Sequence, residues 1–218
     1  MNHELVNRTL TSLLLLPVLV YATYYSGIYL IALLSIVYLI SFYEIIKNTK
    51  NLLFIAISNF FLIFAFFSFY YLRGSTNYSL FTIYWILIST ILSDIGGYTL
   101  GKTLKGKKLT KISPNKTYSG SAGSFLFSLF SLPFLNFIQS FVFSEMFINF
   151  YQIKYLLLTL AISTVCQFGD LCVSYWKRRS KIKDISNILP GHGGVLDRID
   201  GLIFVLIFSL ILKKSGLI

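Results

Sequence analysis

Long apolar runs alternate with short polar segments along the whole chain. The apolar runs cover residues 10–26, 28–45, 52–72, 80–100, 121–140, 155–175 and 200–213. Most of them approach the length of about 20 residues that a helix needs to cross a bilayer. The last run is short for a full crossing, and the apolar stretch 141–153 either extends the fifth run or lies at the interface. The pattern predicts an all-α, polytopic membrane bundle with about seven transmembrane helices.

Composition supports this fold class. Hydrophobic residues make up 56% of the chain, charged residues only 12%, and the mean hydropathy is +0.73. A soluble fold of this size has too little interior for so much apolar surface, whereas lipid solvates it directly. The first run lacks a small-residue cleavage site, so no secretory signal is expected. Cys166 and Cys172 share one apolar run and are expected as buried apolar side chains, not as a disulfide or metal pair.

The basic residues predict an orientation. If the N-terminus lies in the cytoplasm, the inside segments hold all but four of the 19 basic residues. Basic residues favour the cytoplasmic side of short loops, so we expect a protein of the cell (inner) membrane with its active loops in the cytoplasm. The net charge of +11 therefore predicts contact with lipid head groups or phosphates, and no nucleic acid.

Two polar segments, 101–120 and 176–200, are long and rich in Gly, Lys, Ser and Pro, which is typical of loops. No internal repeat is visible, so one membrane domain over 1–218 is the simplest organisation. Its N-terminal membrane helices cover about 10–72, and its catalytic part covers about 80–213 with the two loops.

Five of the eight acidic residues lie at or beside these loops: Asp94, Asp170, Asp184, Asp197 and Asp200. A carboxylate near the end of a membrane helix is costly and needs a partner or a function. One alternative is an interfacial carboxylate paired with a loop lysine. Clustered carboxylates also suit Mg²⁺, which takes one or two of them together with substrate phosphates.

The second loop carries a glycine-rich turn, 190–194, and then opens the final apolar run. Glycines let backbone N–H groups approach a phosphate, and a helix start favours anions. The alternative is a plain turn followed by a helix cap. The mixture of cations, carboxylates, histidine and glycines in this order favours a site.

These two loops resemble the signature of the phosphatidate cytidylyltransferases, also called CDP-diacylglycerol synthases. The second loop matches at Ser174, Lys177, Arg178, Lys183, Asp184, Pro190, His192, Gly193, Gly194, Asp197, Arg198 and Asp200. The first matches at Ser93, Asp94, Gly97, Tyr98, Gly101, Lys102, Gly106, Lys107, Ser113, Pro114, Asn115, Lys116, Thr117 and Gly120. The matched loops cover about a quarter of the chain.

The resemblance implies transfer of cytidylate from CTP to phosphatidic acid, which gives CDP-diacylglycerol and pyrophosphate in phospholipid biosynthesis. It implies Mg²⁺ as cofactor, with a second metal ion left open. The expected metal ligands are Asp170 and Asp197, supported by Asp94 and Asp200. Membrane lipids are expected partners, and a homodimer is left open.

The other expected site residues contact phosphates. The expected catalytic cations are Lys177, Arg178 and Arg198, with His192 as a loop-orienting or phosphate contact. Residues expected to bind the triphosphate or the lipid head group are Lys102, Lys107, Lys116, Gly193 and Gly194. Ser174 lies one turn after Asp170 and is expected on the same helix face.

Three other functions remain as alternatives. A transporter also carries buried carboxylates, but here the charge is concentrated in two one-sided loops. A related enzyme with a different lipid, or a CTP-using lipid kinase, would keep the same chemistry. A purely structural membrane scaffold would have no need of the His-Gly-Gly turn.

Overall fold

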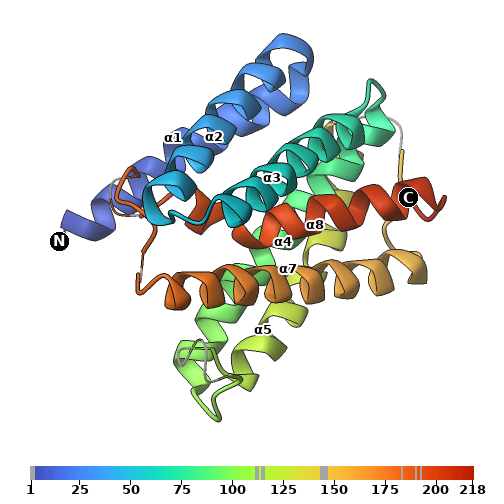
Figure 1. Ribbon diagram of the computed structural model, residues 1–218. Coiled ribbons are helices and arrows are strands. Elements are labelled where there is room, and N and C mark those ends of the chain that lie inside the picture. The colour runs from blue at the N-terminus through green and yellow to red at the C-terminus, as the bar shows by residue number, and fades with distance from the viewer. Residues whose placement is uncertain are drawn as a thin grey trace.

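The computed structural model describes residues 3–110, 113, 116–142, 147–182, 184–189, 191 and 193–218. Its helices are α1 (His3–Tyr25), α2 (Gly27–Asn48), α3 (Leu52–Arg73), α4 (Asn77–Leu104), α5 (Tyr118–Leu129), α6 (Ser131–Val142), α7 (Ile153–Arg179) and α8 (Leu196–Lys214) (Figure 1). Every apolar run predicted from the sequence is helical, which confirms the all-α fold class.

In the part of the chain that the structure describes, five helical segments are long and apolar enough to cross a membrane. They are α2, α3, α4, the segment Tyr118–Val142 that joins α5 and α6, and α7. The apolar part of α1, Leu13–Tyr25, is shorter. Helix α8 has 19 residues and carries charged residues at both ends, so its apolar part is also short. Of the seven or so predicted membrane helices, five are long enough to cross a membrane, and the other two, α1 and α8, have shorter apolar parts.

The helices differ from the predicted runs mainly at their ends. Helix α4 continues to Leu104 and α7 to Arg179, while α8 already begins at Leu196. The loops are therefore 105–117 and 180–195, shorter than predicted, because the polar helix ends stay helical beyond the apolar core. The fifth run breaks at Phe130, since Pro133 lacks the N–H that would bond to the carbonyl of Leu129.

Helix α4 lies at the centre of the bundle and packs against α3, α5, α6, α7 and α8. Its contact with α5 is especially close at Gly96 and Gly123. A Cβ atom on Gly96 would lie 2.3 Å from the carbonyl oxygen of Gly123, and one on Gly123 would lie 2.4 Å from that of Gly96. Small residues allow such approach between membrane helices. The contact places the end of α4 that carries Asp94 beside the start of α5.

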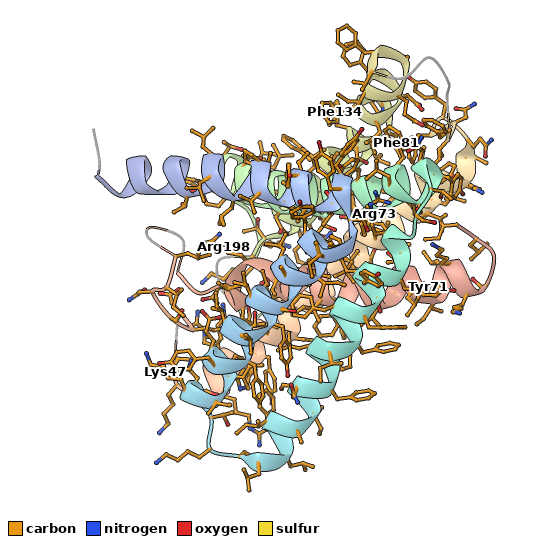
Figure 2. The ribbon with its side chains drawn as sticks, turned by 90° about the horizontal axis from the view of Figure 1, so that it is seen from above. Lys47, Tyr71, Arg73, Phe81, Phe134 and Arg198 are labelled. Atoms are coloured by element: carbon orange, nitrogen blue, oxygen red, sulfur yellow. The ribbon has the colours of Figure 1, made fainter. Side chains whose placement is uncertain are left out.

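The two functional loops, as we call the connections 105–117 and 180–195, lie at the same end of the bundle. In Figure 1, the connections α4–α5 and α7–α8 lie on the side where α2 passes into α3. Figure 2 shows Arg198 and Lys47 toward this end, away from Tyr71 and Arg73. The sequence-based expectation that these loops share one side of the membrane agrees with this arrangement.

A buried carboxylate from α2 fixes the start of α8. Glu44 is fully buried, and its two oxygens accept hydrogen bonds from the N–H groups of Val195 (2.9 Å) and Leu196 (2.8 Å). The hydroxyl of Ser186 donates a further hydrogen bond to Glu44. The first N–H groups of a helix have no partner inside the helix, and negative charge there is favourable. Glu44 therefore caps α8 from another helix.

Arg73 has the opposite role at the other end of the bundle. This buried guanidinium donates hydrogen bonds to the carbonyls of Thr23, Tyr24 (2.8 Å) and Gly74 (3.1 Å). Thr23 and Tyr24 belong to the last turn of α1, where carbonyls lack helical partners and positive charge is favourable. Arg73 thus ties the end of α1 to the end of α3.

We expect Glu44→Ala to destabilise the protein by about 3 kcal/mol, because two buried N–H groups lose a charged acceptor. Thermal unfolding of the purified protein in detergent measures this loss as a lower Tm. Glu44→Gln keeps one oxygen acceptor and should lose clearly less. An unchanged Tm for Glu44→Ala would contradict the capping role.

Candidate active site

A polar cavity of about 370 Å³ lies between α4, α5, α7, α8 and the α4–α5 loop. Its charged lining residues are Asp94, Lys116, Asp170, Lys177, Asp197, Arg198 and Asp200. All seven were predicted from the sequence as site residues. The two signature loops and the helix ends beside them therefore contribute to one cavity.

Asp170 of α7 faces the first loop. Its carboxylate lies 2.5 Å from the ammonium of Lys116, and both side chains are partly exposed to the cavity. The hydroxyl of Ser174 donates a hydrogen bond of 3.3 Å to the other oxygen of Asp170. Helix α7 continues through this region, so the predicted placement of Ser174 one turn after Asp170 is confirmed. Ser174 itself is buried and orients the carboxylate.

Asp94 and Asp200 bring two further carboxylates to the same cavity. The thiol of the fully buried Cys166 donates a hydrogen bond of 3.4 Å to Asp94. Asp200 is only 9% exposed and accepts a hydrogen bond of 2.9 Å from the N–H of Gly201. The negative charge of Asp170 acts on both of these carboxylates, because all three line one confined space. This concentration of negative charge favours a bound cation.

Asp197 lies in a different environment. Its Oδ1 forms an ion pair of 2.7 Å with Lys177, which links α8 to α7. Its Oδ2 accepts hydrogen bonds from the N–H groups of Ile185 (2.9 Å) and Gly194 (3.3 Å). Both oxygens thus hold the second loop against the start of α8. These contacts fit a positioning role better than the expected role as a metal ligand.

The glycine-rich turn bonds to the protein itself. The N–H of Gly193 bonds to the carbonyl of Leu189 at 3.1 Å, and the N–H of Gly194 bonds to Asp197. The next two N–H groups bond to Glu44. The sequence suggested that these N–H groups face a phosphate, but here protein oxygens take that place. His192 lies outside the described residues, so its role stays a prediction.

Three predicted cations, Lys102, Lys107 and Arg178, do not line the polar cavity. Lys102 lies over the ring of Tyr98 at 5.5 Å, and its ammonium donates a hydrogen bond of 3.4 Å to the Tyr98 hydroxyl. The side chain of Lys107 is exposed on the first loop, and the side chain of Arg178 is exposed at the end of α7. Lys116, Lys177 and Arg198 thus line the polar cavity, whereas the other three predicted cations do not.

Two further polar residues, Gln167 and Glu44, were not predicted as site residues, because the sequence shows no motif around them. Gln167 accepts a hydrogen bond of 2.6 Å from Ser121, which joins α7 to α5. Glu44 does not line the cavity, but it accepts a hydrogen bond of 2.8 Å from the N–H of Leu196 and so supports the start of α8 from α2. A single polar residue inside an apolar run gives no periodic or spacing pattern, and only the packing reveals its partner.

Divalent cation binding would depend on few protein ligands. Among the described residues, no group of three Asp, Glu, His or Cys side chains is placed so that it could hold a metal ion by itself. Mg²⁺ in phosphate-transferring enzymes usually keeps one or two carboxylates and completes its shell with water and substrate phosphates. The carboxylates of Asp94, Asp170 and Asp200 fit that kind of incomplete site.

Similarity to known proteins agrees with this site. The pattern that defines the cytidylyltransferase family matches residues 47–215. The phosphatidate cytidylyltransferase of Bacillus subtilis (strain 168) is 34% identical over 182 residues, which are 82% of this chain and 65% of that protein. The enzyme of that name from Rickettsia bellii (strain RML369-C) is 38% identical over 128 residues, 58% of this chain and 54% of its own length.

A third relative, the phosphatidate cytidylyltransferase of Helicobacter pylori (strain ATCC 700392 / 26695), is 39% identical over 123 residues. The match covers 56% of this chain and 43% of that protein. The chain thus spans less than two thirds of the length of these relatives. The family match covers well over half of the chain and includes every residue that lines the polar cavity. The chain belongs to the cytidylyltransferase family.

Proposed function

We propose that this chain transfers cytidylate from CTP to phosphatidic acid, giving CDP-diacylglycerol and pyrophosphate in phospholipid biosynthesis. One observation carries the proposal: four carboxylates and three cations from α4, α7, α8 and the first loop line a single cavity at one end of a membrane bundle. The family membership and the similarity to phosphatidate cytidylyltransferases support this choice.

The reaction needs little acid–base chemistry. The attacking group is a lipid phosphate that is already ionised at neutral pH, and pyrophosphate is a good leaving group. The difficulty is to bring two anions together and to stabilise charge on the α-phosphate and on the departing pyrophosphate. Lys116, Lys177 and Arg198 line the cavity and supply positive charge for this purpose.

Mg²⁺ is the proposed cofactor, and one or two of the carboxylates of Asp94, Asp170 and Asp200 would hold it together with substrate phosphates. When bound, it would neutralise phosphate charge in the cavity. Lys116 already neutralises Asp170 across 2.5 Å, which supports a position for positive charge between the first loop and α7. Cys166 and Ser174 orient two of the three carboxylates through hydrogen bonds.

The proposed location is the cytoplasmic side of the cell membrane. All but four basic residues belong to the N-terminal segment, to the end of α2 and the turn after it, or to the two functional loops with their flanking helix ends. The positive-inside rule assigns that end of the bundle to the cytoplasm, where CTP is dissolved. The phosphate of phosphatidic acid lies at the same head-group level. Both substrates therefore reach a cavity placed at this end.

Purified protein in lipid vesicles should release pyrophosphate only when CTP and phosphatidic acid are both present. We expect Asp170→Asn to lower kcat about 100-fold, because the charge opposite Lys116 is lost. Thr164→Ala, a change on the exposed side of the same helix, serves as control. Formation of a phosphorylated lipid in place of a CDP-lipid would identify a lipid kinase, and solute flux without pyrophosphate would identify a transporter.

A Mg²⁺ titration separates the roles of two carboxylates. We expect Asp170→Asn to need a severalfold higher Mg²⁺ concentration for half-maximal rate, since a metal ligand is weakened. Asp197→Asn should lower the rate and the Tm through the lost ion pair with Lys177, but leave the Mg²⁺ midpoint unchanged. Equal shifts in both variants would show that Asp197 is a metal ligand after all.

A further inference from the structure

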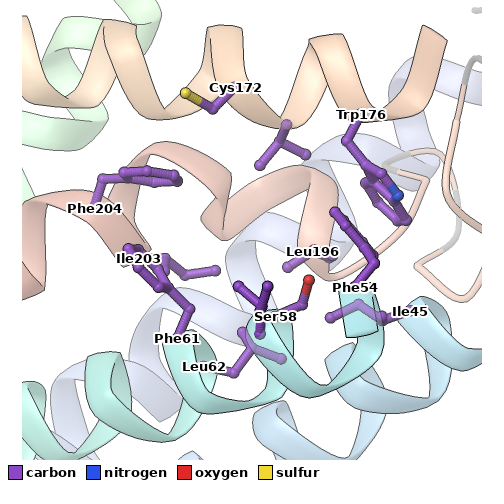
Figure 3. Close-up of a pocket in the computed structure, with 12 residues that line it drawn as sticks. Ile45, Phe54, Ser58, Phe61, Leu62, Cys172, Trp176, Leu196, Ile203 and Phe204 are labelled. Atoms are coloured by element: carbon purple, nitrogen blue, oxygen red, sulfur yellow. The ribbon is translucent and has the colours of Figure 1, made fainter. Parts of the chain in front are cut away.

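A second cavity, which we call the apolar cavity, lies between α3, α7 and α8 (Figure 3). Its volume is about 250 Å³. Apart from Ser58 and Cys172, its lining side chains are aliphatic or aromatic. Two aromatic pairs mark its ends. The ring centres of Phe54 and Trp176 lie 5.3 Å apart, and those of Phe61 and Phe204 lie 5.4 Å apart.

The apolar cavity opens toward lipid. Its walls α3 and α7 are both long and apolar enough to cross a membrane. Ile57 and Phe61, which line it from α3, are 56% and 38% exposed. An opening between two membrane-crossing helices faces hydrocarbon, so water is a poor occupant and an acyl chain is a good one.

The apolar cavity lies next to the polar cavity through shared helices. On α7, Trp176 lines the apolar cavity and its neighbour Lys177 lines the polar one. On α8, Leu196 lines the apolar cavity and its neighbour Asp197 lines the polar one. The ion pair between Lys177 and Asp197 therefore lies at the boundary between the two cavities. A ligand with a phosphate at one end and a hydrocarbon chain at the other matches this boundary.

We propose that the apolar cavity holds one acyl chain of the lipid substrate while the lipid phosphate lies on the Lys177 side of the polar cavity. This inference rests on the proposed function and names the lipid subsite of that reaction. Phe54 and Trp176 flank the chain near the head group, and Phe61 and Phe204 flank its far part. The cavity thus sets how much of the chain is buried.

Filling the apolar cavity tests this directly. Ser58 lies in its middle, and Ser58→Phe places a ring where the chain would lie (Figure 3). We expect the ratio of rates with dioleoyl and dioctanoyl phosphatidate to fall about tenfold, equivalent to roughly two methylene groups losing their apolar contact. Ala56→Phe adds the same ring at an exposed position of α3 and should leave the ratio unchanged.

Crosslinking gives a second measurement that needs no turnover. A phosphatidate with a diazirine on its acyl chain should label peptides of α3 and α7 that line the apolar cavity. Ser58→Phe should reduce this labelling, and unlabelled dioleoyl phosphatidate should compete with it better than dioleoyl phosphatidylcholine. Equal competition by both lipids, or labelling confined to outward-facing residues such as Phe60, would overturn the inference.

The outcomes separate the two proposals. If the wild-type protein releases no pyrophosphate from CTP and phosphatidic acid, the proposed function fails. If it does, but Ser58→Phe and Ala56→Phe give the same ratio of rates, only the acyl-chain site fails.

Discussion

The start of α8 depends on a buried carboxylate that comes from another helix. Val195 and Leu196 at the start of α8 are buried, and the apolar side chain of Val195, the N-cap residue, makes no capping hydrogen bond. Glu44 of α2 accepts hydrogen bonds from the N–H groups of Val195 and Leu196, and from the hydroxyl of a serine in the preceding loop. Gly194 permits this approach, because a Cβ there would lie 2.9 Å from Glu44. The position of Asp197 and Asp200 in the polar cavity follows from this cap.

Buried charge in this protein has two uses, and the partners distinguish them. Glu44 and Arg73 bond to backbone groups at helix ends, with the sign that the helix dipole favours. They tie α2 to α8 and α3 to α1. Asp94, Asp170 and Asp200 instead line open space, together with Lys116, Lys177 and Arg198. The first arrangement stabilises the fold, and the second is the kind found at functional sites.

Helices α7 and α8 separate two chemically different cavities. One side of the pair carries carboxylates and cations, and the other carries aromatic and aliphatic side chains. Gly169 and Gly201 allow the two helices to pack closely, since a Cβ on either would lie 2.7 Å from a side chain of the partner helix.

The sequence alone determined the helices, the two functional loops and most of the charged cavity residues, because apolar length and local spacing follow from neighbours along the chain. It also led to the correct family through the order of Lys177, Asp197, Arg198 and Asp200. Tertiary structure decided which groups meet. Glu44 is one carboxylate in an apolar run, and only folding brings it to a helix 151 residues away. The same holds for Lys116 with Asp170, for the N–H groups of the glycine-rich turn, and for the apolar cavity, since such contacts depend on helix packing and not on local pattern.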